Sequence, residues 1–324
     1  MDGLFSIPIL SVFLVPVLST YKTSLNLLFF YMTWSTLVLS HSRLRIELCA
    51  TIGVRFIFYV LPSVVFFLFD VMAPEAAVHI KAHGTVGLPG GKKRRNISAK
   101  EFKVAAWSLF NLCLGITMQW LLESTIIRIL GKRSVLSSSL KLPMPVEICK
   151  DLSLALIARE VLAYCLHRWF LHSDDYMFFA TWHQRWHHEL TAPYPLTAHY
   201  DHPVCYLLFK FIPTYAPVIA CRFHMVTYLF YLLLISVEET FAYSGYTIMP
   251  TNFLLGGMAR RTDLHLLVDS PGNYGLWGGM DWLLGTIIRE SEDEDDEGDN
   301  TPSIPAQRRV VPAVPAAPVR ARRR

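Results

Sequence analysis

Residues 166–203 read LHRWFLHSDDYMFFATWHQRWHHELTAPYPLTAHYDHP and contain seven of the twelve histidines in the chain. Neutral imidazole binds metal ions near pH 7 through one ring nitrogen, and its other nitrogen remains available for an orienting hydrogen bond. A single histidine in an apolar chain is usually a satisfied core residue, but seven within one short stretch indicate a metal site. The seven are His167, His172, His183, His187, His188, His199 and His202.

The spacing of these histidines predicts which of them share a helical face. His183 and His187 are four residues apart and lie on one face of an α-helix, whereas the adjacent His188 points in another direction. His167 and His172 are five residues apart, about 140° around an α-helix, which suits two flanking metal ions better than one. Histidine ligands with few thiolates favour iron, zinc or copper over magnesium or calcium, which prefer oxygen ligands.

Three short motifs are built around these histidines. They are His167-Arg-Trp-Phe-Leu-His172, His183-Gln-Arg-Trp-His187-His188 and His202-Pro203. In combination they resemble the fatty-acid hydroxylase and sterol desaturase superfamily, and the similarity covers residues 150–287 because it continues through three later runs. These are residues 238–246, which begin Glu-Glu-Thr, Asn273-Tyr274-Gly275, and residues 281–286, which begin Asp-Trp.

The resemblance implies an integral membrane oxygenase that hydroxylates or desaturates an unactivated carbon of a fatty acyl or sterol lipid. Histidine-rich boxes in the superfamily surround two metal ions, normally iron, and electrons arrive from NAD(P)H through a reductase and cytochrome b5. We expect a separate electron donor, because the chain has no haem-binding motif or Rossmann fingerprint. The implied metal ligands are His167, His172, His183, His187, His188, His199, His202 and, from a later segment, His265.

The chain departs from the family pattern where relatives usually have three further histidines. Those positions are occupied by Tyr243, Thr262 and Leu266. Leucine has no ligating atom and a neutral threonine hydroxyl binds these metals poorly, whereas tyrosinate can bind ferric iron. We therefore predict an asymmetric centre, with one histidine-rich metal and a second, weaker one completed by water or by oxygen ligands such as Tyr243 or Asp263. Further candidates for the gap are His199, Asp201 and Glu239.

Two other functions remain open at this stage. The lost ligands fit a pseudoenzyme that keeps the scaffold and binds a lipid or a partner enzyme. The remaining histidines also suffice for a mononuclear zinc hydrolase, because zinc catalysis needs about three protein ligands and an open position. The number and identity of the bound metal ions distinguish these functions from an oxygenase.

The composition is that of a membrane protein. Hydrophobic residues make up 52% of the 324 residues and charged residues 17%, which is apolar for a soluble chain of this length. The six cysteines show no paired spacing, so we interpret them as small hydrophobic residues in a reducing compartment. Apolar runs predict an all-α protein with several membrane-spanning helices. The runs cover residues 4–18, 24–40, 52–69, 104–122, 152–166, 204–220 and 225–237.

The distribution of charge predicts which side of the membrane the histidines face. The loop at residues 81–103 is rich in lysine and arginine, which places it in the cytosol. Two apolar runs separate this loop from His167, and two more separate His202 from His265, so all these histidines return to the side of the loop. We expect an integral protein of the endoplasmic reticulum whose metal site faces the cytosol.

Glu160 lies seven residues before His167 and therefore on the same helical face. One interpretation makes it a second-shell residue that orients an imidazole. The other makes it the partner of Arg159 or Lys150 at the membrane surface. The sequence leaves both open.

The sequence divides into three parts. Residues 1–145 form an N-terminal transmembrane region, residues 146–287 a fatty-acid hydroxylase-like domain, and residues 288–324 a tail. An acidic block in the tail is followed by sequence rich in proline, alanine and arginine, which predicts disorder.

Overall fold

The computed structural model describes residues 20–82, 84–85, 87–89, 99–173, 176–190, 193–248, 252–267, 272–290 and 310–312. The predicted apolar run at residues 4–18 and most of the tail, residues 291–309 and 313–324, lie outside the described residues. The described part is helical, as the sequence predicts, apart from one short pair of strands.

The N-terminal half of the described chain contains two long helical rods. Each rod includes a π-helical turn: η2 joins α3 to α4 in the first, and η3 ends the second after α6. The label η marks π-helical and 3₁₀ turns alike. The elements are α2 (Thr20–Ser40), α3 (Arg43–Arg55), η2 (Phe56–Val60), α4 (Leu61–Met72), α5 (Pro74–Ile80), α6 (Ala99–Ser124) and η3 (Thr125–Ile129).

The C-terminal half carries the histidine motifs on shorter elements. In order they are α7 (Pro145–Leu166), η4 (His167–Leu171), α8 (Met177–Trp186), η6 (His187–Glu189), η7 (Pro195–Thr197), α9 (Pro203–Tyr206), η8 (Leu207–Phe211), α10 (Ile212–Cys221), α11 (Met225–Ala242), η9 (Asn252–Gly256), α12 (Gly257–Leu267) and α13 (Gly279–Leu283). The strands β1 (Ile288–Glu290) and β2 (Val310–Pro312) pair antiparallel, with Arg289 opposite Val311.

Four of the helical segments in the described residues are long and apolar enough to cross a membrane. They are Arg43–Met72, Ala99–Ile129, Pro203–Cys221 and Met225–Ala242, and they contain four of the predicted apolar runs. The run at 24–40 forms a shorter apolar helix, Leu25–Ser40, and the run at 152–166 lies in α7, which is not among the four. The prediction of a multi-span helical membrane protein is confirmed.

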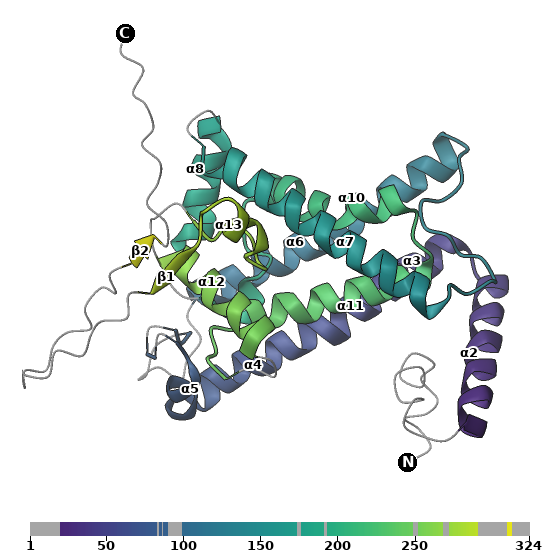
Figure 1. Cartoon of the computed structure of the whole chain (residues 1–324), viewed down its shortest axis with the longest axis horizontal. Coiled ribbons are helices and arrows are strands. Elements are labelled where there is room, and N and C mark those ends of the chain that lie inside the picture. The colour runs from purple at the N-terminus through teal and green to yellow at the C-terminus, as the bar shows by residue number, and fades with distance from the viewer. Residues whose placement is uncertain are drawn as a thin grey trace, which may run out of the picture.

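Although α7 carries charged residues, it packs in the bundle beside α10 and α11 (Figure 1). Its Arg159 donates to both carboxylate oxygens of Glu238 on α11, at 2.9 and 3.1 Å, and both side chains are nearly buried. A buried arginine is tolerated where a carboxylate neutralises it and accepts its hydrogen bonds. The charge that makes α7 less apolar than its neighbours is therefore used to attach it to α11.

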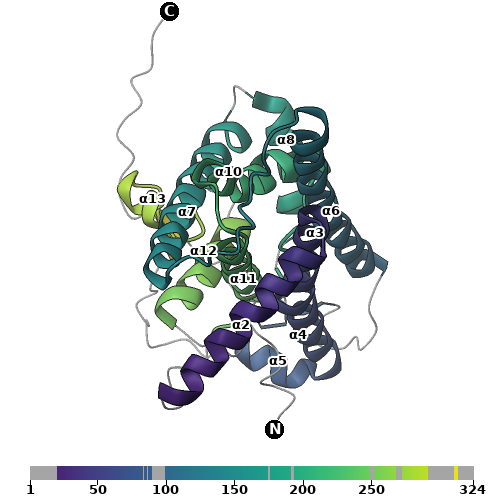
Figure 2. The same cartoon turned by 90° about the vertical axis from the view of Figure 1, so that its right-hand side faces the viewer.

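The elements that carry the histidines gather at one end of the bundle. α8, α12, α13 and β1 lie at the end opposite α2 in Figure 1, and the view along the bundle in Figure 2 shows the long helices surrounding α11. Lys81, the first basic residue of the predicted cytosolic loop, reaches this same end, where it pairs with Asp70 at 2.8 Å and donates to the Ser244 carbonyl at 2.7 Å. The basic loop thus begins at the histidine end, as the sequence predicts; the compartment that this end faces stays a prediction.

The bundle is apolar outside and partly polar inside. Phe56, Ile57 and Val65 on the first rod are each more than half exposed, which suits contact with lipid rather than water. Inside, the Tyr228 hydroxyl donates to Gln119, and Gln119 donates to Glu47, each at 2.7 Å. Polar side chains in membrane helices face the bundle interior and pair with one another.

Candidate metal centre

A π-helical turn at the end of α7 brings His167 and His172 together. Because a π-helix bonds residue i to residue i+5, residues five apart lie nearly on one face of the turn η4. Their ring centroids are 5.0 Å apart. The expectation that this pair suits two flanking metal ions assumed a regular α-helix; the structure instead directs both rings to one point.

The second motif behaves as its spacing predicts. His183 and His187 lie one turn apart on α8 and its continuation, with nearly parallel rings 4.7 Å apart. His188 follows in the short 3₁₀ turn η6, and its ring is turned by 81° from that of His187. It lies 5.3 Å from the His172 ring and 5.0 Å from the His265 ring.

His265 on α12 completes the cluster from a segment far away in sequence. Its ring is 4.7 Å from that of His167 and 5.1 Å from that of His172. One ligating atom from each of four histidines, His167, His172, His183 and His265, lies within 4.8 Å of the others. We call the six residues His167, His172, His183, His187, His188 and His265 the histidine group.

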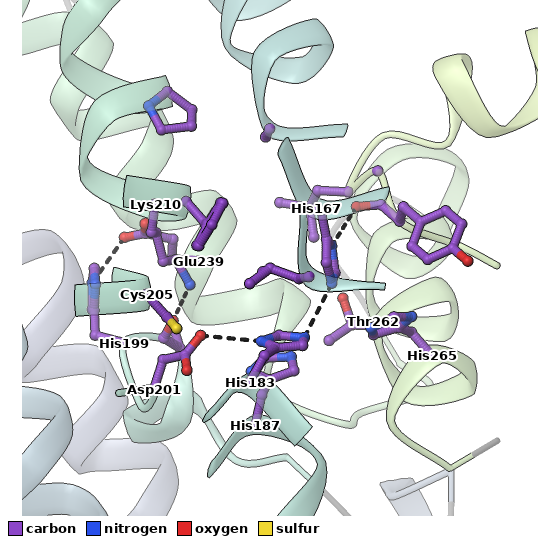
Figure 3. A pocket seen from close by; sticks show the side chains of 18 of the residues that line it. His167, His183, His187, His199, Asp201, Cys205, Lys210, Glu239, Thr262 and His265 are labelled. Atoms are coloured by element: carbon purple, nitrogen blue, oxygen red, sulfur yellow. Dashed lines mark hydrogen bonds and ion pairs between the residues drawn. The ribbon is translucent and has the colours of Figure 1, made fainter. Parts of the chain in front are cut away.

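Hydrogen bonds to Nδ1 orient three of these rings. His167 donates from Nδ1 to the Tyr274 carbonyl and His265 to the Gly272 carbonyl, each at 2.9 Å, because a carbonyl can only accept. The Nδ1 of His183 is 3.3 Å from Oδ2 of Asp201 (Figure 3). Each bond leaves Nε2 as the ligating atom, the arrangement that metal-binding histidines use.

The Nε2 atoms fit a metal ion better than they fit one another. Nε2 of His167 and Nε2 of His183 are 3.3 Å apart, and among the described residues Nε2 of His172 and of His265 has no hydrogen-bond partner. Buried acceptor atoms without a donor are costly, and a cation bound between them removes that cost. The donor set is all nitrogen, which suits iron, zinc or copper.

Burial keeps five members of the histidine group neutral. It lowers the pKa of His172 to about 2 and that of His265 to about 3, and neighbouring histidines add to the shift. The same two causes hold the pKa of His167, His183 and His187 well below 6.5. Neutral imidazole is the form that binds metal, so the group needs no deprotonation at physiological pH.

A closed loop between α12 and β1 positions the carbonyls that hold His167 and His265. Asp281 accepts from the backbone N–H groups of Tyr274 and Gly275 at 2.9 and 2.8 Å, and from the Thr286 hydroxyl at 2.7 Å. A Cβ at Gly275 would lie 2.6 Å from Oε1 of Glu160, so a larger residue there would displace that carboxylate. The Asn-Tyr-Gly and Asp-Trp runs that resemble the superfamily therefore support the metal centre from outside it.

Glu160 acts through this loop. Its carboxylate accepts from the backbone N–H of Trp277 at 3.0 Å, while Arg159 pairs with Glu238. Neither interpretation made from the sequence describes this contact. Glu160 binds the loop whose Tyr274 carbonyl accepts from His167, so Glu160 contacts the loop and not the imidazole itself.

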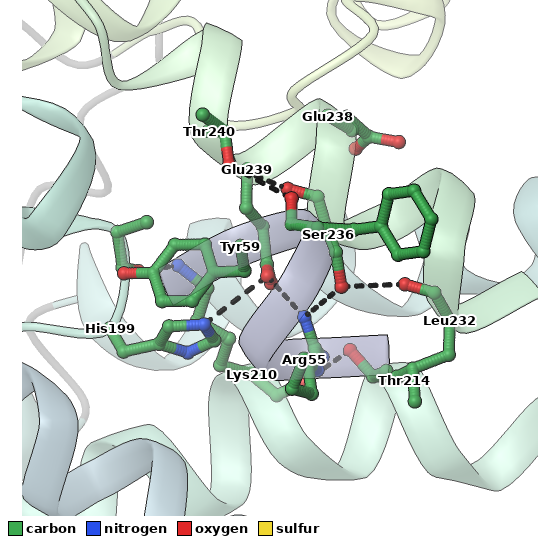
Figure 4. A network of polar contacts seen from close by, with 12 residues as sticks. Arg55, Tyr59, His199, Lys210, Thr214, Leu232, Ser236, Glu238, Glu239 and Thr240 are labelled. Atoms are coloured by element: carbon green, nitrogen blue, oxygen red, sulfur yellow. Dashed lines mark hydrogen bonds and ion pairs between the residues drawn. The ribbon is translucent and has the colours of Figure 1, made fainter. Parts of the chain in front are cut away.

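Two of the histidines expected as ligands lie outside the histidine group. His202 caps α9, accepting from the Val204 N–H at 3.3 Å, and stacks on Trp182 with ring centroids 3.9 Å apart. His199 is buried with its Nε2 3.2 Å from a carboxylate oxygen of Glu239, the oxygen that also binds Arg55 at 2.6 Å (Figure 4).

The residues that stand where the superfamily has further histidines have other partners. The Thr262 hydroxyl donates to the Met258 carbonyl at 3.0 Å. The Tyr243 ring lies under the ammonium of Lys210, 4.7 Å from its centroid. Leu266 is buried, and Asp263 is buried where its charge acts on Lys81.

A cavity of about 140 Å³ adjoins the histidine group. One side, which we call the histidine wall, is formed by His167, His183, His187 and His265; the other, the charged wall, by His199, Asp201, Lys210 and Glu239 (Figure 3). Apolar side chains of α7, η4, η8 and α10 line part of the remainder, namely Ala163, Leu171, Phe209 and Pro213, together with polar residues such as Arg159, Thr214 and Asn273. The cavity therefore extends from the histidines into the interior of the helical bundle.

The structure gives two residues roles that the sequence does not predict. Asp201, a candidate substitute ligand by sequence, is the hydrogen-bond partner of His183. Lys210 lines the cavity, and its position inside the apolar run at 204–220 is a recognisable signal, because ionisable residues within membrane helices are usually functional.

Comparisons with known proteins agree with the sequence motifs. Residues 152–286 match the family model described as fatty acid hydroxylase. The chain is 28% identical over 209 residues to the very-long-chain aldehyde decarbonylase GL1-11 of Oryza sativa, an alignment that covers 60% of this chain and 72% of the relative. It is 32% identical over 167 residues to methylsterol monooxygenase 2-2 of Arabidopsis thaliana, covering 50% of this chain and 59% of the relative. No solved structure matches the chain significantly.

Proposed function

Because residues 152–286 belong to the fatty acid hydroxylase family, we propose that the protein is a membrane-bound, metal-dependent oxygenase that hydroxylates or desaturates a lipid. The observation that carries the proposal is the convergence of neutral histidine Nε2 atoms on one point beside a cavity that opens into an apolar helical bundle. The relatives are named for a very-long-chain aldehyde and a methylsterol, both of which are lipids.

We propose iron as the metal, held by Nε2 of His167, His172, His183 and His265, with His187 and His188 adjacent. Bound iron would supply the redox chemistry that activates dioxygen. Electrons would come from NAD(P)H through cytochrome b5 or a reductase, since the chain carries no motif for a redox cofactor of its own.

The residues around the cavity bind and align the substrate. Ala163, Leu171 and Phe209 provide an apolar surface for a methylene chain or a sterol ring, and they exclude water from the histidine wall. Asp201 holds the Nδ1 proton of His183, which keeps that ring in the tautomer whose Nε2 faces the centre. The loop carbonyls of Gly272 and Tyr274 do the same for His265 and His167.

The proposal includes a location. We infer an integral protein of the endoplasmic reticulum with the histidine end in the cytosol, which is supported by the basic loop that begins at that end. Single cysteines introduced at Ser98 and Ser291, in a background without the native cysteines, should react with an impermeant reagent added outside sealed microsomes. Labelling of either position only after the membrane is opened would reverse the orientation.

The activity test uses anaerobically purified protein, reconstituted with Fe(II) and given a chemical or enzymatic reductant and a lipid extract. We expect dioxygen uptake coupled to a hydroxylated or desaturated lipid, detected by mass spectrometry. His265→Ala should abolish both, and His202→Ala, which removes a half-buried ring stacked on Trp182, should retain them. Uptake that does not require the metal, or that survives His265→Ala, would reject the proposal.

A further inference from the structure

Lys210 is a charged residue inside a candidate membrane-spanning segment, Pro203–Cys221. Its ammonium donates to the Ala198 carbonyl, lies 4.7 Å from the centroid of the Tyr243 ring, and lines the cavity opposite the histidine wall (Figure 3). Burying a charged lysine within a membrane segment costs free energy, so such a residue is usually functional and paired with nearby anions.

The negative charges of the charged wall are compensated by cations of the protein, Lys210 among them, so no second metal ion is needed to neutralise them. Glu239 binds Arg55 at 2.6 Å, so this pair is neutral. The remaining carboxylate, Asp201, accepts from neutral donors in the described part of the chain, namely the ring of His183 and the backbone N–H of His202. Lys210 supplies the compensating charge, since it interacts electrostatically with Asp201, Glu239 and His187.

The ligands beside Lys210 are too few for a second metal ion. A second candidate group consists of His183, His187 and Asp201. However, Nε2 of His183 points toward Nε2 of His167 at 3.3 Å, and its Nδ1 is bound to Asp201, so its ligating atom belongs to the first site. Of that group, among the described residues, only His187 and Asp201 then remain, one fewer than the about three protein ligands that metal sites of this kind need. His199, which lines the same cavity, has its Nε2 3.2 Å from the carboxylate of Glu239.

The side chains at the substituted family positions do not supply the missing ligand. The Thr262 hydroxyl donates within its own helix, and the Tyr243 ring faces the ammonium of Lys210. A second dication would therefore have to bind to two ligands beside an existing cation. Electrostatic repulsion inside a low-dielectric cavity opposes this strongly.

We propose that the ammonium of Lys210 takes the place of a second metal ion, so that this chain binds one metal where its superfamily binds two. The inference deepens the proposed function, on which it rests. It replaces the expectation of a second, weaker metal completed by oxygen ligands with a fixed organic cation.

The first test is the metal content of the unmodified protein. After anaerobic loading with Fe(II) and removal of loosely bound ions, we expect about one iron per folded chain by elemental analysis. Oxidised samples should give the Mössbauer and electron paramagnetic resonance signature of an isolated high-spin ferric ion. Two irons per chain, or the diamagnetic signature of a coupled ferric pair, would overturn the inference while leaving the proposed function intact.

The second test separates the effect of the lysine from that of the missing ligands. A Tyr243→His/Thr262→His variant that keeps Lys210 should still bind about one iron per chain, because the cation remains. Adding Lys210→Met to this variant should raise the content to about two. Equal contents in the two variants, at either value, would show that Lys210 does not exclude a second ion and would reject the inference.

Gel filtration and thermal unfolding of each variant confirm that only folded chains are counted. The unmodified protein gives a result independent of the variants. A wild-type chain that binds no transition metal at all would reject both this inference and the proposed function, whereas two irons reject this inference alone.

Discussion

The two walls of the cavity use opposite electrostatic strategies. The histidine wall is uncharged: Nδ1 of His167, His183 and His265 has a hydrogen-bond partner, whereas Nε2 of His265 has none among the described residues. On the charged wall, Glu239 binds Arg55 and lies 3.2 Å from Nε2 of His199. The histidine wall is therefore arranged for a metal ion, whereas the charges of the other wall are compensated within the protein.

The largest effect is expected from removing a member of the histidine wall. His265→Ala should lower metal affinity by more than the about 100-fold loss that changes outside the ligand shell produce, because its Nε2 is itself among the converging atoms. His199→Gln, on the charged wall, should keep the metal. Elemental analysis and competition with a chelator measure the metal affinity of both variants. Equal losses of affinity would show that the two walls do not differ in metal binding.

The charged wall should instead determine stability. Glu239→Ala leaves Arg55 buried without its carboxylate, and breaking a buried pair costs about 3–5 kcal/mol of unfolding free energy. The matched control is Glu189→Ala, which breaks an exposed pair with Lys100 and should cost about 0–1 kcal/mol. Denaturant unfolding in detergent compares them; similar midpoints for the two variants would contradict the role assigned to Glu239.

Asp201 belongs to the charged wall but contacts the histidine wall, and it should affect metal binding without being a ligand. Asp201→Ala removes the acceptor that orients His183 and should weaken metal binding about 10–100-fold. Asp201→Asn, whose amide oxygen can still accept from Nδ1, should recover most of the affinity. If the asparagine variant is as weak as the alanine variant, Asp201 acts by its charge or by direct ligation instead.

The smallest effect concerns pH, because the walls titrate in opposite senses. The histidine pKa values of about 2 for His172 and about 3 for His265 lie below the unfolded value near 6.5, so the unfolded chain binds more protons and their contribution falls as pH drops below 6.5. Burial raises the pKa of Asp201 to about 7, above its unfolded value, so Asp201 costs stability at high pH and less as pH falls.

The destabilisation from several histidines at low pH exceeds the stabilisation from the one carboxyl group of Asp201. The metal-free protein should therefore unfold at a lower temperature at pH 5 than at pH 7. His172→Gln should reduce this difference, and Asp201→Asn should enlarge it. Thermal unfolding across this range measures both slopes, and a metal-free protein that gains stability on acidification would show that the histidines are not held neutral by burial.

Much of the site was predictable from sequence where geometry is local. The pairing of His183 with His187 follows from one turn of helix and is observed. For His167 and His172 the spacing argument assumed a regular α-helix, whereas the structure has a π-helical turn there, which no spacing rule predicts. His199 and His202 share the histidine-rich stretch with the group but lie outside it, since the chain between η6 and α9 turns them toward Glu239 and Trp182.

The sequence by itself determined the helical membrane architecture and the inventory of ligands. Both depend on properties that each segment has alone: the length of an apolar run, which fixes whether it can cross a bilayer, and the identity of the side chains it carries. Only the tertiary structure decided which atoms meet. Tyr274 reaches His167 from 107 residues away, and Lys210 lies over the ring of Tyr243 on another helix, because contacts between distant segments depend on how helices pack, not on spacing along the chain.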